Sequence, residues 1–122
     1  MSAPRTVTVP TLDQGNITIT EPAWCAGHDG DQPQFRSDTG HLGAPHRADF
    51  DGDELAFAAL AQDPFAEHAD RSVGVLVEMG QLARALTPAE LDGLAAVLVD
   101  YAGTLRRLAR QLSALRTEGE GR

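Results

Sequence analysis

The sequence is poor in the residues that usually hold a small protein together. Its 122 residues include one cysteine, no lysine, one tryptophan, one tyrosine and four phenylalanines. A single cysteine cannot form an internal disulfide, which excludes the class of small secreted proteins stabilised by disulfides. With so few aromatic residues, the core must consist mainly of aliphatic side chains. A chain of this length can still bury about two thirds of its unfolded surface, so we expect one domain with its own core.

Positive charge and long apolar segments are also scarce. The 18 acidic residues outnumber the 10 arginines, and the resulting net charge of −8 repels phosphate backbones and anionic lipid surfaces. The aliphatic segments are interrupted before the roughly 18 residues that a membrane-spanning helix needs. The first residues lack the apolar segment of a signal peptide. We therefore predict no nucleic-acid partner, no membrane partner and a cytoplasmic location.

Two segments near the N-terminus alternate β-branched and polar residues. Residues 6–10 read TVTVP and residues 16–20 read NITIT, and the Asp, Gly and Asn residues between them favour a turn. This pattern predicts a β-hairpin over residues 6–20. Pro22 then ends the second strand, and residues 21–52 show no sustained periodicity of a strand or a helix. A structureless stretch of that length is unusual inside a compact domain, so a function, a stabilising element such as a bound metal, or disorder must account for this Cys/His loop.

The middle of the chain contains one clear strand and one ambiguous segment. Residues 72–79, SVGVLVEM, are rich in valine and predict the central strand of a small antiparallel sheet. Residues 53–63, DELAFAALAQD, place apolar side chains where they suit one face of a helix or one face of a strand. Alanine favours a helix in isolation, whereas a strand could pair with the segment that follows. Both alternatives stay open.

The strongest local signal is the start of a C-terminal helix. Thr87 can cap free N–H groups, Pro88 suits the first helical position, and Glu90 sits where a capping-box carboxylate reaches back. Acidic residues near this start and arginines toward the end both interact favourably with the helix dipole. We predict a helix over residues 88–115, about 43 Å long. A disordered tail is expected over residues 117–122.

Apolar residues along this helix follow an unbroken heptad spacing of three and four. The flanking positions carry alanine, valine, threonine and glutamine, not the charges through which parallel coiled coils choose partners. We expect the first half to pack on the domain's own sheet. The helix is longer than the strands it could cover, so we expect its second half to contact a partner, most simply a second subunit. The predicted homodimer interface comprises Leu98, Tyr101, Leu105, Leu108, Leu112 and Leu115.

The residues that commonly bind metals are concentrated in the Cys/His loop. The predicted ligands of a structural zinc ion are Cys25, His28, His41 and His46. Their spacing, C-x2-H-x12-H-x4-H, is that of a zinc finger with one cysteine replaced by histidine. Gly43 and Pro45 exclude a helix between the last two histidines, so a DNA-reading finger is not predicted. Nearby carboxylates offer alternative ligands, and a metal-free surface loop with Cys25 packed beside Trp24 is the competing interpretation.

These elements resemble an uncharacterised family of small actinobacterial proteins, over roughly residues 6–110. The elements that carry the resemblance are Pro22-x-Trp24-Cys25, His28, His-x-Gly at residues 41–43 and Leu-Thr-Pro-Ala-Glu at residues 86–90. Members of that family typically carry Cys-Pro-x-Trp-Cys, and Glu21 stands here in place of the first cysteine. The resemblance implies the architecture and a cytoplasmic bacterial setting, and it implies no reaction.

Together, these features predict a single α+β domain over residues 1–116, with a small antiparallel sheet, a Cys/His loop and one long C-terminal helix. The leading functional hypothesis is a small non-enzymatic interaction or regulatory module that holds a structural zinc ion and dimerises through its helix. The alternative is a zinc- or thiol-dependent enzyme of unknown substrate that uses Cys25 and His28. A thiol enzyme is disfavoured because no third residue is marked out to orient the base. The sequence also lacks a glycine-rich phosphate-binding loop.

Overall fold

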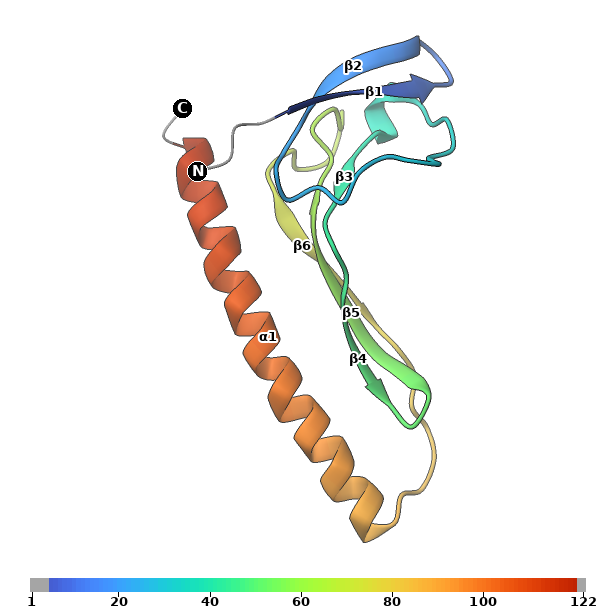
Figure 1. Ribbon diagram of the computed structural model, residues 1–122, viewed down its shortest axis with the longest axis vertical. Helices are drawn as coiled ribbons and strands as arrows, with labels where there is room; N and C mark the ends of the chain where they lie inside the picture. Colours follow the sequence, from blue (N-terminus) through green and yellow to red (C-terminus); the bar gives the residue numbers. More distant parts are fainter. Residues whose placement is uncertain (1–4, 121–122) are drawn as a thin grey trace. The chain divides into compact units, whose positions relative to one another are not determined.

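The elements run in the order of two strands, a short 3₁₀-helix, four further strands and one long α-helix. The structure, a computed structural model, describes residues 5–120 (Figure 1). Its internal contacts define two units. The N-terminal unit takes the described residues up to Ala44 together with Leu60–Gly74, and the helical unit takes Pro45–Ala59 with the described residues from Val75 onward. Small antiparallel sheets and one long C-terminal helix confirm the predicted α+β class.

The first two strands form the predicted hairpin. Strand β1 (Arg5–Thr11) pairs antiparallel with β2 (Gly15–Glu21) along the whole length of both. The Thr11 hydroxyl closes the turn, because it donates to the Gly15 carbonyl at 2.6 Å and accepts from the Gln14 N–H at 2.9 Å. Gly15 has a φ of +64°, which glycine adopts without steric cost. Of the turn residues recognised in the sequence, Gly15 takes part in these contacts, whereas the Thr11 hydroxyl was not predicted.

Strand β5 (Asp53–Gln62) is the central strand of the other sheet. Its partners are β3 (His41–Leu42), β4 (His46–Phe50) and β6 (Gly74–Met79). The prediction of a central strand at residues 72–79 needs correction: a strand is present there, but it begins at Gly74 and pairs with β5 alone. A valine-rich composition indicates that a segment is extended, and it does not indicate the place of the strand in the sheet.

Residues 53–63, which were ambiguous in the sequence, contain β5. Adjacent residues of a strand point to opposite faces, and both Ala58 and Ala59 are 0% exposed. Burial on both faces removes the alternation of polar and apolar residues by which a half-buried strand is recognised. Pairing along β5 therefore outweighs the helix propensity of its alanines.

Strands β4 and β5 form a hairpin through the two-residue turn Asp51-Gly52. The φ angles of these residues are +51° and +86°, and a type I′ turn requires positive φ at both central positions. This hairpin corrects the prediction that residues 21–52 lack secondary structure. Within that range the structure contains β3, the start of the β4–β5 hairpin and the 3₁₀-helix η1 (Arg36–Asp38).

Helix α1 (Pro88–Glu120) begins at the predicted cap. The N–H of Thr87 donates to a Glu90 carboxylate oxygen at 2.9 Å, and the N–H of Glu90 donates to the Thr87 hydroxyl at 3.2 Å. This reciprocal pair is a capping box. Within the described part of the chain, no helix has an apolar stretch long enough to cross a lipid bilayer.

The helix ends later than predicted. The prediction places the helix at residues 88–115 and a disordered tail at residues 117–122, whereas α1 continues to Glu120. Gly119 is the first residue of low helix propensity near that end, so nothing in the sequence breaks the helix at residue 115. Residues 121 and 122 lie outside the described part of the chain.

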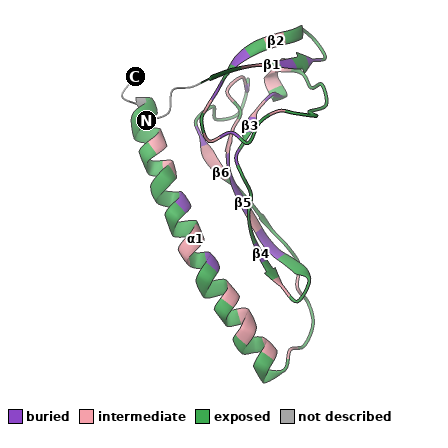
Figure 2. Cartoon of the chain, viewed as in Figure 1, coloured by how far each residue is buried: buried purple, intermediate pink, exposed green. Residues whose placement is uncertain are grey.

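The helix packs against β4 within the helical unit. Among the helix side chains that the structure describes, Tyr101 and Leu108 are buried, at 9% and 4% exposure. Figure 2 shows that the rest of the helix is mostly exposed or half-buried. The Tyr101 hydroxyl donates to the His46 carbonyl of β4 at 2.8 Å. Burial, with Glu54 adding a repulsive charge, raises the pKa of the Tyr101 phenol, so this donor keeps its proton at neutral pH. Tyr101 therefore anchors the helix to the sheet.

The six predicted interface residues differ in exposure. Tyr101 and Leu108 are buried in the protein itself, Leu112 and Leu115 are half-buried, and Leu98 and Leu105 are exposed. Leu98 and Leu105 lie one heptad apart, so the exposed leucines form one row along the helix. The heptad positions thus form two rows: one, with Tyr101 and Leu108, is buried in the protein's own core, and the other, with Leu98 and Leu105, is exposed to solvent.

Candidate metal centre

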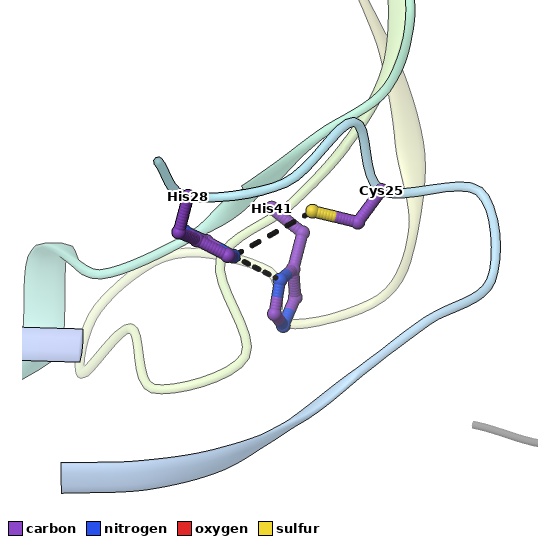
Figure 3. A group of neighbouring side chains, drawn as sticks. All are labelled: Cys25, His28 and His41. Carbon is purple, nitrogen blue, oxygen red and sulfur yellow. Dashed lines mark hydrogen bonds between the residues drawn. The ribbon is translucent and has the colours of Figure 1, made fainter. Parts of the chain in front are cut away.

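A turn after β2 positions Cys25 and His28. The N–H of Cys25 donates to the Pro22 carbonyl at 3.0 Å, and the N–H of Ala26 donates to a carbonyl of β3 at 2.9 Å. Gly27 follows with a φ of +109°, which residues with a Cβ rarely adopt. The Cys25 and His28 side chains point toward each other (Figure 3).

His41 reaches the same place from β3. The turn carrying Cys25 lies against this part of the chain through a β-bridge between Cys25 and Gly43. A Cβ on Gly43 would lie only 3.2 Å from the Trp24 carbonyl oxygen and 3.3 Å from the Cβ of Leu60. The close approach leaves little room for a larger residue. Glycine at position 43 thus allows the turn to pack tightly enough for His41 to face Cys25.

Cys25, His28 and His41 form a group of three potential metal ligands. His28 Nε2 lies 3.5 Å from Cys25 Sγ and 3.2 Å from His41 Nδ1 (Figure 3). One ligand atom from each residue lies within 4.8 Å of those of the other two. The structure therefore brings together three of the four predicted ligands, from two segments of the chain.

The cluster is withdrawn from solvent. Cys25 and His41 are each 4% exposed, and the His28 side chain is 5% exposed. Burial lowers the pKa of the His41 imidazole, and the neighbouring His28 lowers it further, against smaller opposing effects from Glu21 and the Thr20 backbone. His41 is therefore held in the neutral form, which is the form that binds metals.

Contacts around the cluster orient its ligand atoms. His28 Nδ1 lies 2.8 Å from an Asp31 carboxylate oxygen, so the proton on Nδ1 donates to Asp31 and Nε2 faces the cluster. The Gly27 N–H donates to Cys25 Sγ at 3.5 Å. Metal-binding histidines commonly donate their other N–H to a carboxylate in this way. The single lone pair on Nε2 faces both Cys25 and His41, and an ion among the three would satisfy all of them.

Two of the separations among the ligand atoms are compatible with a tetrahedral metal ion such as zinc. Zinc bound about 2.3 Å from sulfur and about 2.0–2.1 Å from nitrogen, at tetrahedral angles, requires a sulfur–nitrogen distance of about 3.5 Å. The corresponding nitrogen–nitrogen distance is about 3.3 Å. The two separations measured from His28 Nε2, 3.5 Å to Cys25 and 3.2 Å to His41, agree with these values. The donor set could therefore hold a metal ion, with the ligand atoms of all three residues within 4.8 Å of one another.

The fourth predicted ligand is not a member of this group. His46 is an exposed residue at the start of β4, and its backbone pairs with Ala58. The four predicted ligands do not include Glu21, although this residue stands where the resembling family carries its first cysteine. Its carboxylate lies 3.5 Å from His28 Nε2, and the residue is 3% exposed. A signal existed: Ile17, Ile19 and Glu21 alternate along β2, so the strand period places the carboxylate on the apolar face.

Comparison with known proteins gives one match. The sequence profile of a family described as a domain of unknown function, DUF6907, matches residues 6–114. No curated protein and no solved structure matches the chain. The predicted membership of an uncharacterised family is confirmed at this level, while the family motif and the actinobacterial origin stay predictions. Because the match spans most of its length, the chain belongs to the DUF6907 family.

Proposed function

We propose that the protein is a small, non-enzymatic interaction module of the cytoplasm, built around a structural zinc ion. Cys25, His28 and His41 hold the ion, which fixes the turn after β2 against β3. The C-terminal helix binds a second copy of the chain through its exposed leucine row. The separations from His28 Nε2, which are those of a zinc tetrahedron, carry the metal part of the proposal.

The ligand types favour zinc over other common cations. Thiolate and imidazole suit zinc, whereas calcium and magnesium prefer shells made of oxygen. Such an ion would also stabilise the N-terminal unit, because it would join the turn after β2 to β3, which contact each other through backbone hydrogen bonds and the Cys25–Gly43 bridge. Binding free energy at such a site adds directly to folding free energy.

Burial of the cluster favours a structural role over a catalytic one. A catalytic zinc ion keeps a coordination position open to water and substrate. Here the three ligand side chains are each about 5% exposed or less. The thiol of Cys25 is equally withdrawn, which disfavours its use as a nucleophile toward a substrate in solution. An interaction module is therefore the better account of this geometry than an enzyme.

The charge pattern of α1 favours a second copy of the helix as the partner. Val99, which is 75% exposed, lies beside the exposed leucine row. Asp92 precedes Val99 by one heptad and Arg106 follows it by one heptad, and both are exposed. Two copies that cross antiparallel at Val99 therefore place Asp92 opposite Arg106 of the partner subunit, and Arg106 opposite the partner's Asp92. The same face carries the small residues Ala95 and Ala102, which permit close approach.

Metal analysis of protein purified without a histidine tag tests the zinc proposal. We expect one zinc ion per chain and, after chelation, loss of cooperative unfolding in the N-terminal unit. Cys25→Ser should lower zinc affinity strongly, while His68→Gln, at an exposed histidine, serves as the matched control and should leave it unchanged. Absence of bound zinc in the untagged protein, together with no binding on titration, would overturn the proposal.

A further inference from the structure

We propose that Glu21 supplies the fourth ligand of the metal site. The ion would then be held by one thiolate, two imidazoles and one carboxylate. This inference rests on the proposed function, because it requires that Cys25, His28 and His41 bind the ion. It fills the corner of the tetrahedron that these three residues leave open.

Strand geometry places Glu21 at the cluster. Glu21 is the last residue of β2 and pairs with Arg5 of β1. It lies on the same face of the hairpin as the buried Ile19, because alternate residues of a strand share a face. Its side chain is 4% exposed. A carboxylate is seldom buried to this extent unless it is paired with a cation or binds a metal.

The two oxygens of the Glu21 carboxylate have different neighbours. Oε1 accepts a hydrogen bond from the Arg5 guanidinium, with which it forms an ion pair. Oε2 lies 3.5 Å from His28 Nε2. That separation exceeds the length of about 2.7–3.2 Å usual for an N–H···O hydrogen bond. It is close to the distance of about 3.4 Å between oxygen and nitrogen ligands of a tetrahedral zinc ion.

Three distances measured from His28 Nε2 can be compared with the edges of a zinc tetrahedron. The distances are 3.5 Å to Cys25 Sγ, 3.2 Å to His41 Nδ1 and 3.5 Å to Glu21 Oε2. These are the three edges that meet at one corner of a zinc tetrahedron. Glu21 is not a member of the group of three potential ligands, so binding requires its carboxylate to move toward Cys25 and His41. Rotation about its side-chain bonds provides that movement.

The other polar side chains near the cluster are placed less well. Asp31 contacts Nδ1 of His28, on the side of the ring away from the cluster, where it orients the imidazole. His46 is exposed on β4 and is not in the group of potential ligands. Glu21 also balances charge, because one thiolate and one carboxylate neutralise a divalent cation in a buried site. Arg5, whose side chain is 55% exposed, then holds the second carboxylate oxygen from outside.

The test compares Glu21→Gln with two matched variants in the untagged full chain. Asp31→Asn removes a carboxylate that also contacts His28, and His46→Gln removes the ligand predicted from sequence spacing. Zinc affinity is measured by competition with a chromophoric chelator, and Co²⁺ replaces zinc for visible spectroscopy. Four-coordinate Co²⁺ has intense d–d bands, whereas higher coordination numbers give weak ones. Folding of each variant is checked by circular dichroism.

We expect Glu21→Gln to weaken zinc binding more than about 100-fold, since loss of an outer-shell partner alone costs about 10–100-fold. It should also change the Co²⁺ bands, whereas Asp31→Asn and His46→Gln keep the wild-type spectrum. If Glu21→Gln fails to fold, Glu21→Asp decides the question, because it keeps the charge for Arg5 and withdraws the oxygen by one methylene.

The outcomes separate this inference from the proposed function. Wild-type zinc binding with an unchanged affinity and Co²⁺ spectrum in the Glu21 variant overturns the carboxylate ligand and leaves the zinc site standing. Loss of the four-coordinate spectrum in His46→Gln, with Glu21→Gln normal, also overturns it. A wild-type chain that binds no metal overturns the proposed function itself, and the inference with it.

Discussion

Truncation of two leucines that lie ten residues apart on α1 separates the core role of the helix from its role in assembly. Leu108 is 4% exposed and Leu98 is 50% exposed. A Leu→Ala change removes three carbons, each contributing about 0.8 kcal/mol when fully buried. Leu108→Ala therefore loses about 2.4 kcal/mol of stability because three buried carbons are removed. Including the cavity left behind, we expect the free energy of unfolding to fall by a total within the usual range of about 2–5 kcal/mol. Leu98→Ala in a monomer loses about half of the transfer contribution, about 1 kcal/mol, and leaves no cavity.

The dimer dissociation constant should respond to the two variants in the opposite order: Leu98→Ala should change it more than Leu108→Ala. If the exposed half of Leu98 is buried by the second copy, its truncation costs about 1 kcal/mol in each subunit. The dimer then loses about 2 kcal/mol, and its Kd rises about 30-fold. Leu108→Ala should leave this Kd nearly unchanged while the free energy of unfolding falls. Denaturant unfolding at low concentration and sedimentation equilibrium at tens of micromolar measure the two effects.

Two results would refute this reasoning. Equal losses of unfolding free energy for Leu98→Ala and Leu108→Ala in dilute protein would show that the helix does not pack by the face described above. A monomeric wild-type protein at tens of micromolar would refute dimerisation through the leucine row.

Three further changes have defined outcomes. Asp92→Arg should weaken the dimer by like-charge repulsion, and Asp92→Arg combined with Arg106→Asp should restore it; sedimentation measures both, and failure of the double variant to recover would contradict the antiparallel arrangement. Gly80→Ala should destabilise the protein by about 3 kcal/mol, because its Cβ would lie 2.0 Å from a backbone oxygen, whereas Gly74→Ala meets nothing within 4 Å and should be nearly neutral in thermal unfolding. Hydrogen bonds from the Thr87 N–H and then from Arg84 lower the pKa of Glu90, so the ionised carboxylate stabilises the protein above pH 4.5 and this effect is lost as the pH falls below that value. The difference in stability between wild type and Glu90→Gln should therefore shrink below pH 4.5, and a constant difference would contradict the assignment.

The local features of the fold could be predicted from the sequence. The hairpin and the start of α1 depend on contacts between residues close in the chain, and their turn and cap residues are visible as such. The Asp51-Gly52 turn was equally local, and it predicts the β4–β5 hairpin once the two flanking segments are aligned. Strand β5 was harder, because its burial on both faces is decided by partners distant in sequence.

The candidate site was predictable in part for a related reason. Cys25, His28 and His41 are recognisable by residue type, and the structure brings them together. Spacing alone selected His46 as the fourth ligand, although residue 46 begins a strand that pairs with β5. Glu21 belongs to another element and comes close to His28 only through the tertiary packing of the hairpin. Ligand type can therefore be read from composition, whereas completion of a coordination shell depends on the fold.

Strand β5 contributes Asp53–Ala59 to the helical unit and Leu60 onward to the N-terminal unit. We therefore expect amide hydrogens on the two sides of the Ala59–Leu60 peptide bond to report on different opening reactions of one continuous strand. If the proposed zinc ion is bound, its removal should accelerate deuterium uptake from Leu60 onward and leave the preceding amides of the strand protected. Within β5, the amides before Leu60 thus serve as the reference for those after Ala59. A sharp change in exchange rate at the Ala59–Leu60 bond would measure how independently the two units open.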